Sequence, residues 1–279
     1  MKPTHHAGGE NELVSLDPDH PGFRDAVYRE RRNEIARIAL AYESGNPVPL
    51  APYSEEEHRV WADIWTALAP LHRDKVAREI LELQPFLPLG GDRIPQLRDL
   101  NQDLHNAAGF RMEPVAGLVT ARTFMRYLGK RVFLSTQYIR HHSKPFYTPE
   151  PDVVHELVGH AATLVHPGIA EVNRLLGMAA EVANDREMTR IGNVYWYTME
   201  FGLVDQEGTT KAYGAGLLSS VGELSGFESQ TTMNDWDLTK IAATDFDPTT
   251  YQTELFVAPS FTRMLVDVSR WVRNGDWRD

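Results

Sequence analysis

The sequence predicts one mainly α-helical domain with a few short β-strands. Apolar residues recur at helical spacing along most of the chain, and only short segments are rich in β-branched and aromatic residues. No repeat, low-complexity segment or linker divides it. With 279 residues and 42% hydrophobic residues, the chain is long enough to bury a sizeable core. We expect a flexible N-terminal tail over residues 1–18 and a folded domain over residues 19–279.

Helical spacing, capping residues and helix breakers define the expected helices. They cover residues 22–44, 54–70, 72–83, 94–109, 120–128, 169–183, 187–201, 215–224 and 260–272. In the first of these, the charged run at residues 28–34 is expected to face solvent. Ser54 and Glu57 match the capping-box pattern that opens the second helix, and Pro70 is expected to end or kink it.

The expected strands are few and short. Residues 110–117 look extended, and residues 131–138 are rich in β-branched and aromatic side chains. Residues 203–213 are predicted to form a hairpin around Glu207-Gly208, and a last strand is expected near residues 255–258. Helices therefore dominate the predicted fold.

The segment from Gln137 to His160 carries the most informative pattern. Pro149 and Pro151 precede a short apolar helix that contains His155 and His160. Five residues correspond to about 140° around an ideal α-helix, whereas zinc proteases place two histidines four residues apart. Both imidazoles can therefore reach one metal ion only if the helix ends or bends near Gly159. Without a metal, the two histidines would be ordinary structural residues.

A third ligand would complete a metal site. Two histidines and one carboxylate on one face of the ion are typical of non-haem Fe(II) oxygenases. Glu200 is the outstanding candidate, because it lies in the aromatic-rich segment NVYWYTMEFGL, where an unpaired carboxylate is costly to bury. A buried ion pair with Arg140 is the alternative explanation for Glu200.

Composition excludes several classes of protein. A net charge of −11 argues against nucleic acid or an anionic membrane as the main partner. The absence of cysteine excludes disulfides and thiolate metal sites. The sequence shows neither a secretory signal nor an apolar run of membrane-spanning length, so we expect a cytoplasmic protein.

Three long motifs together resemble one family. They are TQYIRHHSKPFYTPEPDVVHELVGH, VYWYTMEFGL and KAYGAGLLSSVGEL, and shorter matches such as DHPGF and IPQLRDLN precede them. From about Asp19 to its end, the chain looks like the catalytic domain of the pterin-dependent aromatic amino acid hydroxylases. It is most similar to the bacterial phenylalanine hydroxylases.

The resemblance implies a role for each candidate residue. One Fe(II) would be held by His155, His160 and Glu200. A reduced pterin, tetrahydrobiopterin or a relative, would lie beside Gly117, Leu118, Val119, Ala121 and Phe124, with the catalytic residues Glu156 and Tyr195 on the oxygen-activating side. The amino acid would be bound by Arg140, Thr148, Pro151, Trp196, Phe201, Gly216 and Ser219. Ser219 and Ser220 are also candidates for orienting an iron-bound histidine.

The function implied is ring hydroxylation of L-phenylalanine with O2, giving L-tyrosine, by a monomer. Trp196 suits hydroxylases of phenylalanine or tyrosine, because tryptophan hydroxylases tend to carry phenylalanine at this position. Within the family, a phenylalanine 3-hydroxylase or a tryptophan hydroxylase of secondary metabolism is the alternative. Outside it, we considered a zinc hydrolase with Glu156 as its base and a non-enzymatic binding module for an amino acid or pterin.

Overall fold

The computed structural model describes residues 13–278. Residues 1–12, which make up most of the predicted tail, lie outside the described residues. Of the rest of that tail, Leu16 is buried and the Leu13 backbone N–H donates to the side chain of Asn33. Residues 13–16 thus pack against the first helix.

Helices make up most of the structure, as the sequence predicts. The α-helices are α1 (Ala26–Leu40), α2 (Glu55–Lys75), α3 (Arg78–Leu81), α4 (Leu97–Ala108), α5 (Ala121–Gly129), α6 (Ala162–Leu164), α7 (Pro167–Val182), α8 (Asp185–Tyr195), α9 (Ala215–Leu218), α10 (Val221–Gln230), α11 (Leu238–Ala243) and α12 (Phe261–Asn274). A 3₁₀-helix, η1 (Gln84–Phe86), and two π-helices, η2 (His155–Ala161) and η3 (Trp196–Glu200), complete the set. Among the described residues, no helix is long and apolar enough to cross a bilayer.

The strands form two small sheets. The first pairs β1 (Arg111–Pro114) with β2 (Val132–Ser135) in parallel. The second has the order β4-β3-β6-β5, built from β3 (Leu203–Gln206), β4 (Thr209–Ala212), β5 (Thr232–Asp235) and β6 (Glu254–Ala258). The β3–β4 hairpin is antiparallel and turns at Glu207 and Gly208, as predicted, while β6 runs parallel to both β3 and β5.

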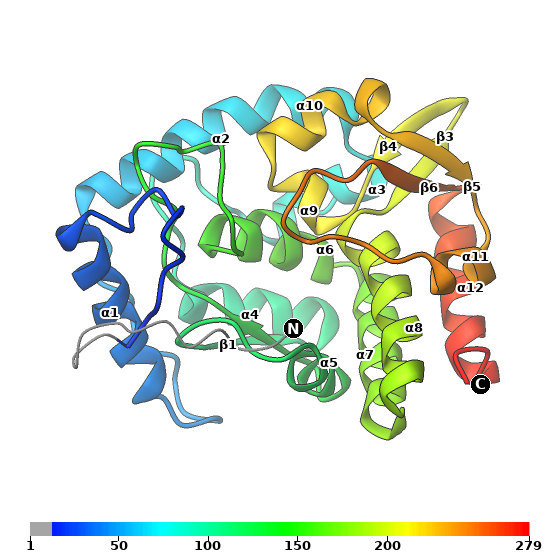
Figure 1. The fold of residues 1–279 in the computed structure, drawn as a ribbon, viewed down its shortest axis with the longest axis horizontal. Coiled ribbons are helices and arrows are strands. Elements are labelled where there is room, and N and C mark those ends of the chain that lie inside the picture. The colour runs from blue at the N-terminus through cyan, green and yellow to red at the C-terminus, as the bar shows by residue number, and fades with distance from the viewer. Residues whose placement is uncertain (1–12, 279) are drawn as a thin grey trace.

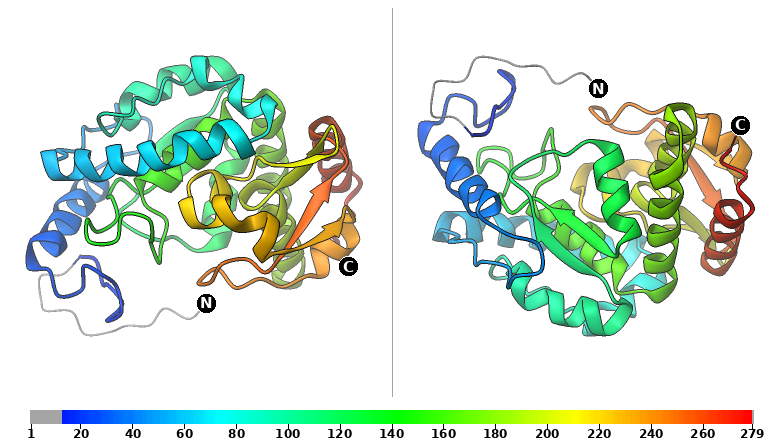
Figure 2. Two further views of the ribbon diagram at one scale, coloured as in Figure 1. Left: turned by 90° about the horizontal axis from the view of Figure 1, so that it is seen from above. Right: turned by 90° about the horizontal axis from the view of Figure 1, so that it is seen from below.

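The two π-helices lie in the middle of the molecule. Figure 1 shows α2 passing over the central segment that ends in α6, with α7 and α8 side by side next to it. The four-stranded sheet and α12 lie at the C-terminal side, and the views from above and below in Figure 2 show the same arrangement. One continuous apolar core, which includes Leu157, Val158, Tyr197 and Met199, encloses both π-helices.

Close packing of α5 on α7 stabilises one wall of this centre. A Cβ atom on Gly177 would lie 2.2 Å from the backbone nitrogen of Gly129 and 2.4 Å from the carbonyl oxygen of Met125. Only glycine therefore allows the two helices to approach this closely. The contact holds α5, which carries Phe124, beside the helix that follows η2 and α6 in the chain.

The structure differs from the prediction in three respects. The second helix continues through Pro70 to Lys75, because proline removes only one backbone donor on the exposed side of a helix that packing holds in place. The predicted helix at 215–224 is two helices, α9 and α10, separated at Ser219-Ser220, where Ser220 caps the second. The sequence analysis missed β5 and α11, which are short and lack a clear periodicity.

The charged run on α1 is not wholly exposed, contrary to expectation. Arg32 is 2% exposed, and its guanidinium lies 3.2 Å from the ring centroid of Tyr138. Its Nη1 donates to Glu150 at 2.8 Å, across the loop that precedes η2. An arginine that stacks on an aromatic ring and pairs with a carboxylate can be buried despite its charge. Arg32 therefore ties α1 to that loop.

Candidate metal and amino-acid site

The first π-helix explains how His155 and His160 come together. A π-helix bonds each residue to its fifth successor, so two residues five apart lie on the same side, one turn above the other. The Nε2 atoms of His155 and His160 are 3.0 Å apart. The expected end or bend of the helix near Gly159 was wrong, because the chain continues without a break into α6. A change of helix type, not of direction, aligns the two rings.

The second π-helix delivers Glu200 to the same place. Its Oε1 lies 3.0 Å from His160 Nε2, and its Oε2 lies 3.5 Å from His155 Nε2. Oxygen and nitrogen ligands of one divalent ion are typically separated by such distances. The predicted alternative, an ion pair between Glu200 and Arg140, is absent: among the described residues Arg140 pairs with Asp152. The structure thus brings the three predicted metal ligands together.

Hydrogen bonds fix which nitrogen of His155 faces the cluster. The Ser219 hydroxyl donates to the carbonyl oxygen of Ala215 at 2.7 Å, so its oxygen accepts from His155 Nδ1–H at 3.0 Å. The lone pair of Nε2 is then directed at Glu200 and His160. Burial lowers the pKa of His155 to about 4, which keeps this imidazole neutral. Ser219 is thus engaged behind His155, whereas Ser220 caps α10.

Charge also favours a cation between these groups. Burial alone would lower the pKa of His160, but the negative charge of Glu200 raises it by more. His160 in turn holds the pKa of the Glu200 carboxyl below its ordinary value. The cluster therefore carries a buried carboxylate whose partners are two imidazoles. Once a metal ion displaces the proton that His160 holds against Glu200, two imidazole nitrogens and one carboxylate oxygen form a donor set that suits Fe(II).

Arg140 is held rigidly by a carboxylate that the sequence analysis did not assign to the site. Its Nε and Nη2 donate to the two oxygens of Asp152, each at 2.8 Å, and Asp152 is fully buried. Burial alone would raise the pKa of Asp152, but the positive charge and hydrogen bonds of Arg140 lower it by more. Among residues 13–278, the Nη1 side of the guanidinium makes one long contact, 3.5 Å, to the carbonyl oxygen of Pro145. That side remains available for a second carboxylate.

Glu156 and Tyr195 flank the cluster. The Glu156 carboxylate accepts two hydrogen bonds at Oε1, from the backbone N–H of Thr136 at 3.2 Å and its hydroxyl at 3.0 Å. Burial raises the pKa of Glu156 to about 7. The pKa of Tyr195 is also well above its ordinary value, through burial first and then through Glu200 and Glu156. Both predicted catalytic side chains therefore lie beside the ligand cluster.

The predicted pterin-binding residues form an exposed apolar surface next to Tyr195. Leu118 is 66% exposed and Val119 is 37% exposed, on the loop between β1 and α5. No atom lies within 4 Å of a Cβ placed on Gly117, and Ala121 opens α5 on the exposed side. Phe124 contacts Phe133 and Tyr195 edge to face, with centroid distances of 5.3 and 5.8 Å. A flat heteroaromatic ring would find an aromatic neighbour here.

An aromatic wall is formed by Trp196 and its neighbours, and Trp196 begins the π-helix that carries Glu200. The Trp196 and Phe201 rings are 4.8 Å apart, and Trp196 stacks on Phe246 at 4.1 Å and 7°. A Cβ on Gly216 would lie 2.7 Å from the Phe201 ring, so glycine is required for this approach. The structure thus assembles the predicted Trp196, Phe201 and Gly216, and adds Phe246.

Thr148 and Pro151 lie on the loop between Arg140 and η2. The Thr148 hydroxyl donates to the carbonyl oxygen of Glu150 at 2.6 Å, and the Tyr138 hydroxyl donates to that of Pro151. These two predicted substrate-binding residues are therefore held mainly by local bonds, and their loop is anchored to α1 through Glu150.

The site depends on residues that the sequence analysis did not identify as part of it. They are Arg32, Phe133, Thr136, Asp152, Glu223, Phe246 and Gln252. Asp152 could have been found, since a buried acid beside a buried arginine is a recognisable pair. Gln252 and Phe246 lie in a segment without a pattern, and only the folded chain brings them to Trp196.

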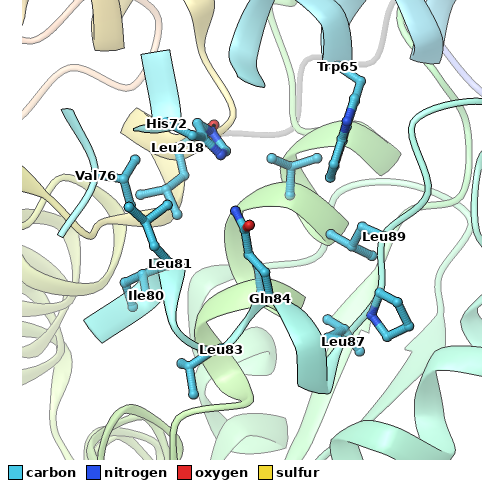
Figure 3. A pocket seen from close by; sticks show the side chains of 13 residues that line it. Trp65, His72, Val76, Ile80, Leu81, Leu83, Gln84, Leu87, Leu89 and Leu218 are labelled. Carbon is cyan, nitrogen blue, oxygen red and sulfur yellow. Dashed lines mark hydrogen bonds between the residues drawn. The ribbon is translucent and has the colours of Figure 1, made fainter. Parts of the chain in front are cut away.

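A separate cavity lies behind the first π-helix. It has a volume of about 120 Å³, and its inner wall is formed by Val158, Ala162 and Leu218. Figure 3 shows Gln84 pointing into it between His72 and Leu87. None of the residues predicted for the site lines this cavity. It is therefore distinct from the candidate active site.

With this geometry established, comparisons with known proteins identify the class. The model of the biopterin-dependent aromatic amino acid hydroxylase family matches residues 10–276. The chain therefore belongs to this family, which confirms the resemblance carried by the three motifs and the predicted mainly α-helical catalytic domain.

Individual relatives include enzymes named for two different substrates. Human phenylalanine-4-hydroxylase is 42% identical over 273 residues, which are 95% of this chain and 60% of that protein. Tyrosine 3-monooxygenase of Canis lupus familiaris is 44% identical over 252 residues, which are 88% of this chain and 51% of that protein. The chain therefore spans about half to three fifths of the length of these relatives.

A bacterial crystal structure gives the comparison in three dimensions. Phenylalanine hydroxylase from Chromobacterium violaceum, with bound iron(III) and 7,8-dihydrobiopterin, superposes with a TM-score of 0.77 at 29% identity. The match covers 87% of this chain and 92% of that one. The fold of the described residues is thus that of the bacterial enzyme.

Glu223, whose carboxyl group lies near the aromatic wall, is expected to make the stability of the protein depend on pH. Burial raises the pKa of Glu223 to about 7, from 4.5. Between these values the folded state retains a proton that the unfolded state releases, so stability falls as pH rises. The loss reaches at most about 3 kcal/mol above pH 7. Glu223→Gln should remove this loss and become more stable than the wild type at pH 8, but not at pH 4.

Denaturant unfolding of both proteins at a series of pH values measures this difference. The control is the surface substitution Glu82→Gln, which should leave the profile unchanged. Parallel stability profiles for the wild type and Glu223→Gln would contradict the prediction.

Proposed function

We propose that this chain is a non-haem Fe(II), tetrahydropterin-dependent monooxygenase that hydroxylates the aromatic ring of L-phenylalanine with O2 to give L-tyrosine. The observation that carries the proposal is the cluster of His155, His160 and Glu200, whose ligand atoms all lie within 4.8 Å of one another. Membership of the family supports the reaction type, and the pocket wall supports an aromatic substrate.

In this proposal His155 Nε2, His160 Nε2 and the Glu200 carboxylate hold the iron. Three protein ligands leave other coordination positions of an octahedral ion open. When bound, the iron would supply the site at which O2 is activated, and the reduced pterin would supply the two electrons that the reaction consumes. Ser219 keeps the proton of His155 on Nδ1, so that Nε2 remains a ligand.

The other side chains bind and orient the two organic molecules. Arg140, fixed by Asp152, directs its Nη1 side at the carboxylate of the amino acid. Trp196 and Phe201 enclose the substrate ring, and their apolar surfaces exclude water from it. The pterin packs on the surface formed by Leu118, Val119 and Phe124.

Hydroxylation of tyrosine is a second candidate, because the canine tyrosine 3-monooxygenase is as similar to this chain as the human phenylalanine-4-hydroxylase. Trp196 is compatible with both substrates by the family resemblance. Hydroxylation of phenylalanine at the 3-position and of tryptophan are the further alternatives within the same site.

Product analysis tests the proposal. The protein is loaded with Fe(II) without oxygen and then mixed with tetrahydrobiopterin, L-phenylalanine and air. We expect para-tyrosine in step with pterin consumption, measured by chromatography against para-, meta- and ortho-tyrosine. Glu200→Ala should form no product and bind iron more weakly, because it removes the only carboxylate of the cluster. Meta-tyrosine, or product only from tyrosine or tryptophan, would contradict the proposed substrate or ring position.

The position of Ser219 predicts a specific effect on metal affinity. Ser219→Ala removes the acceptor for His155 Nδ1–H, and loss of such a support typically lowers metal affinity about 10- to 100-fold. Competition between the protein and a chelator for Fe(II) measures the change. Ser220→Ala is the matched control, because this neighbouring serine caps α10 and does not contact His155. Equal affinities for the two variants would disprove the role of Ser219.

A further inference from the structure

Gln252 is at the centre of a hydrogen-bond network beside the aromatic wall. It is 8% exposed, and its Oε1 accepts from the indole N–H of Trp196 at 2.9 Å. Its Nε2 donates to the carbonyl oxygens of Asp247 and Thr250, both at 2.9 Å. Its backbone N–H donates to Glu223 Oε1 at 3.0 Å. Every polar group of the side chain is therefore engaged.

These bonds fold the segment between α11 and β6 against Trp196. The two carbonyl oxygens belong to the first and last residues of the turn at residues 247–250. By donating to both, Gln252 links the two ends of this turn. At the start of this turn, Phe246 stacks on Trp196 with its ring almost parallel, at 4.1 Å. The Gln252 side chain thus binds the edge of the Trp196 indole directly. It also holds in place the segment whose Phe246 stacks on the face of that indole.

The indole has no second way to satisfy its donor. Tryptophan carries one donor and no acceptor, and among the described residues the bond from Trp196 Nε1 goes to Gln252 alone. Loss of the acceptor would leave a donor without a partner in a largely apolar pocket, which costs free energy unless the ring rotates towards water. Rotation would break the stack on Phe246 and the contact with Phe201. The orientation of the ring therefore depends on Gln252.

We propose that Gln252 is a positioning residue that fixes the Trp196 ring and thereby sets the width of the pocket for the substrate ring. The inference rests on the proposed function, because it assigns the aromatic wall to the amino acid. A fixed indole favours a single-ring side chain. A released indole admits the larger two-ring side chain of tryptophan more readily and holds phenylalanine less well.

Kinetics of Gln252→Leu test this role. We expect KM for L-phenylalanine to rise about tenfold with a smaller change in kcat, as for the loss of one well-placed polar contact. The preference for phenylalanine over tryptophan, as a ratio of kcat/KM values, should fall together with the tyrosine formed per pterin consumed. Gln102→Leu is the matched control, because Gln102 is an exposed glutamine whose side chain bonds to Asn106 on α4.

A double-mutant cycle separates positioning from a general loss of structure. If Gln252 acts through the indole N–H, Gln252→Leu should cost much less in a Trp196→Phe background, where that donor is absent. Additive effects of the two substitutions would overturn the proposal. Should Gln252→Leu fail to fold, Gln252→Met keeps the length of the side chain but offers the indole only a weak acceptor, and it should shift KM and selectivity in the same direction.

A measurement on the indole itself does not depend on catalysis. In protein labelled with ¹⁵N at tryptophan, the Trp196 N–H resonance is identified by its loss in Trp196→Phe. Its exchange with solvent should accelerate at least about tenfold in Gln252→Leu and remain unchanged in Gln102→Leu. If the wild type hydroxylates no aromatic amino acid, the proposed function fails, while this experiment still tests the hydrogen bond. An active wild type whose selectivity or indole exchange is unaffected by Gln252→Leu would overturn the inference.

Discussion

The candidate site depends on a helix type that suits the spacing of its two histidines, because that spacing does not match the period of an α-helix. Five residues separate His155 from His160, and an α-helix would place them on different sides. The π-helix at residues 155–161 places both on one side, and a second π-helix ends at Glu200. A π-helix is less stable than an α-helix and persists only where surrounding packing imposes it. The core around Leu157, Val158 and Tyr197 provides that packing.

Four side chains of the candidate site are each held in place by a hydrogen-bonding partner. Ser219 holds His155, Asp152 holds Arg140, Thr136 holds Glu156 and Gln252 holds Trp196. Such support leaves one defined atom of each residue free and reduces the entropy lost when a ligand binds. The same organisation explains why a chain of this length buries so many charged and polar groups near its centre.

The sequence was sufficient for the helical class and for most helices, which depend on local periodicity. Its family motifs were sufficient to name His155, His160 and Glu200 as candidate ligands, which the fold brings together. It was not sufficient for the π-helices, since helix type at residues 155–161 is decided by packing rather than propensity. Burial of Arg32 was missed because its partners, Tyr138 and Glu150, are more than 100 residues away. Gln252 and Phe246 were missed because Trp196, which both contact, lies in a separate segment, 50 or more residues earlier in the chain. Supporting residues come from distant segments and leave no local pattern.

The most direct test of the account is anomalous diffraction at the iron edge from crystals of the Fe(II)-loaded protein. The account predicts one strong peak that lies within bonding distance, about 2.0–2.3 Å, of His155 Nε2, His160 Nε2 and the Glu200 carboxylate, with residues 155–161 in a π-helix. A peak elsewhere, or an α-helix at these residues with His160 turned away from His155, would contradict it.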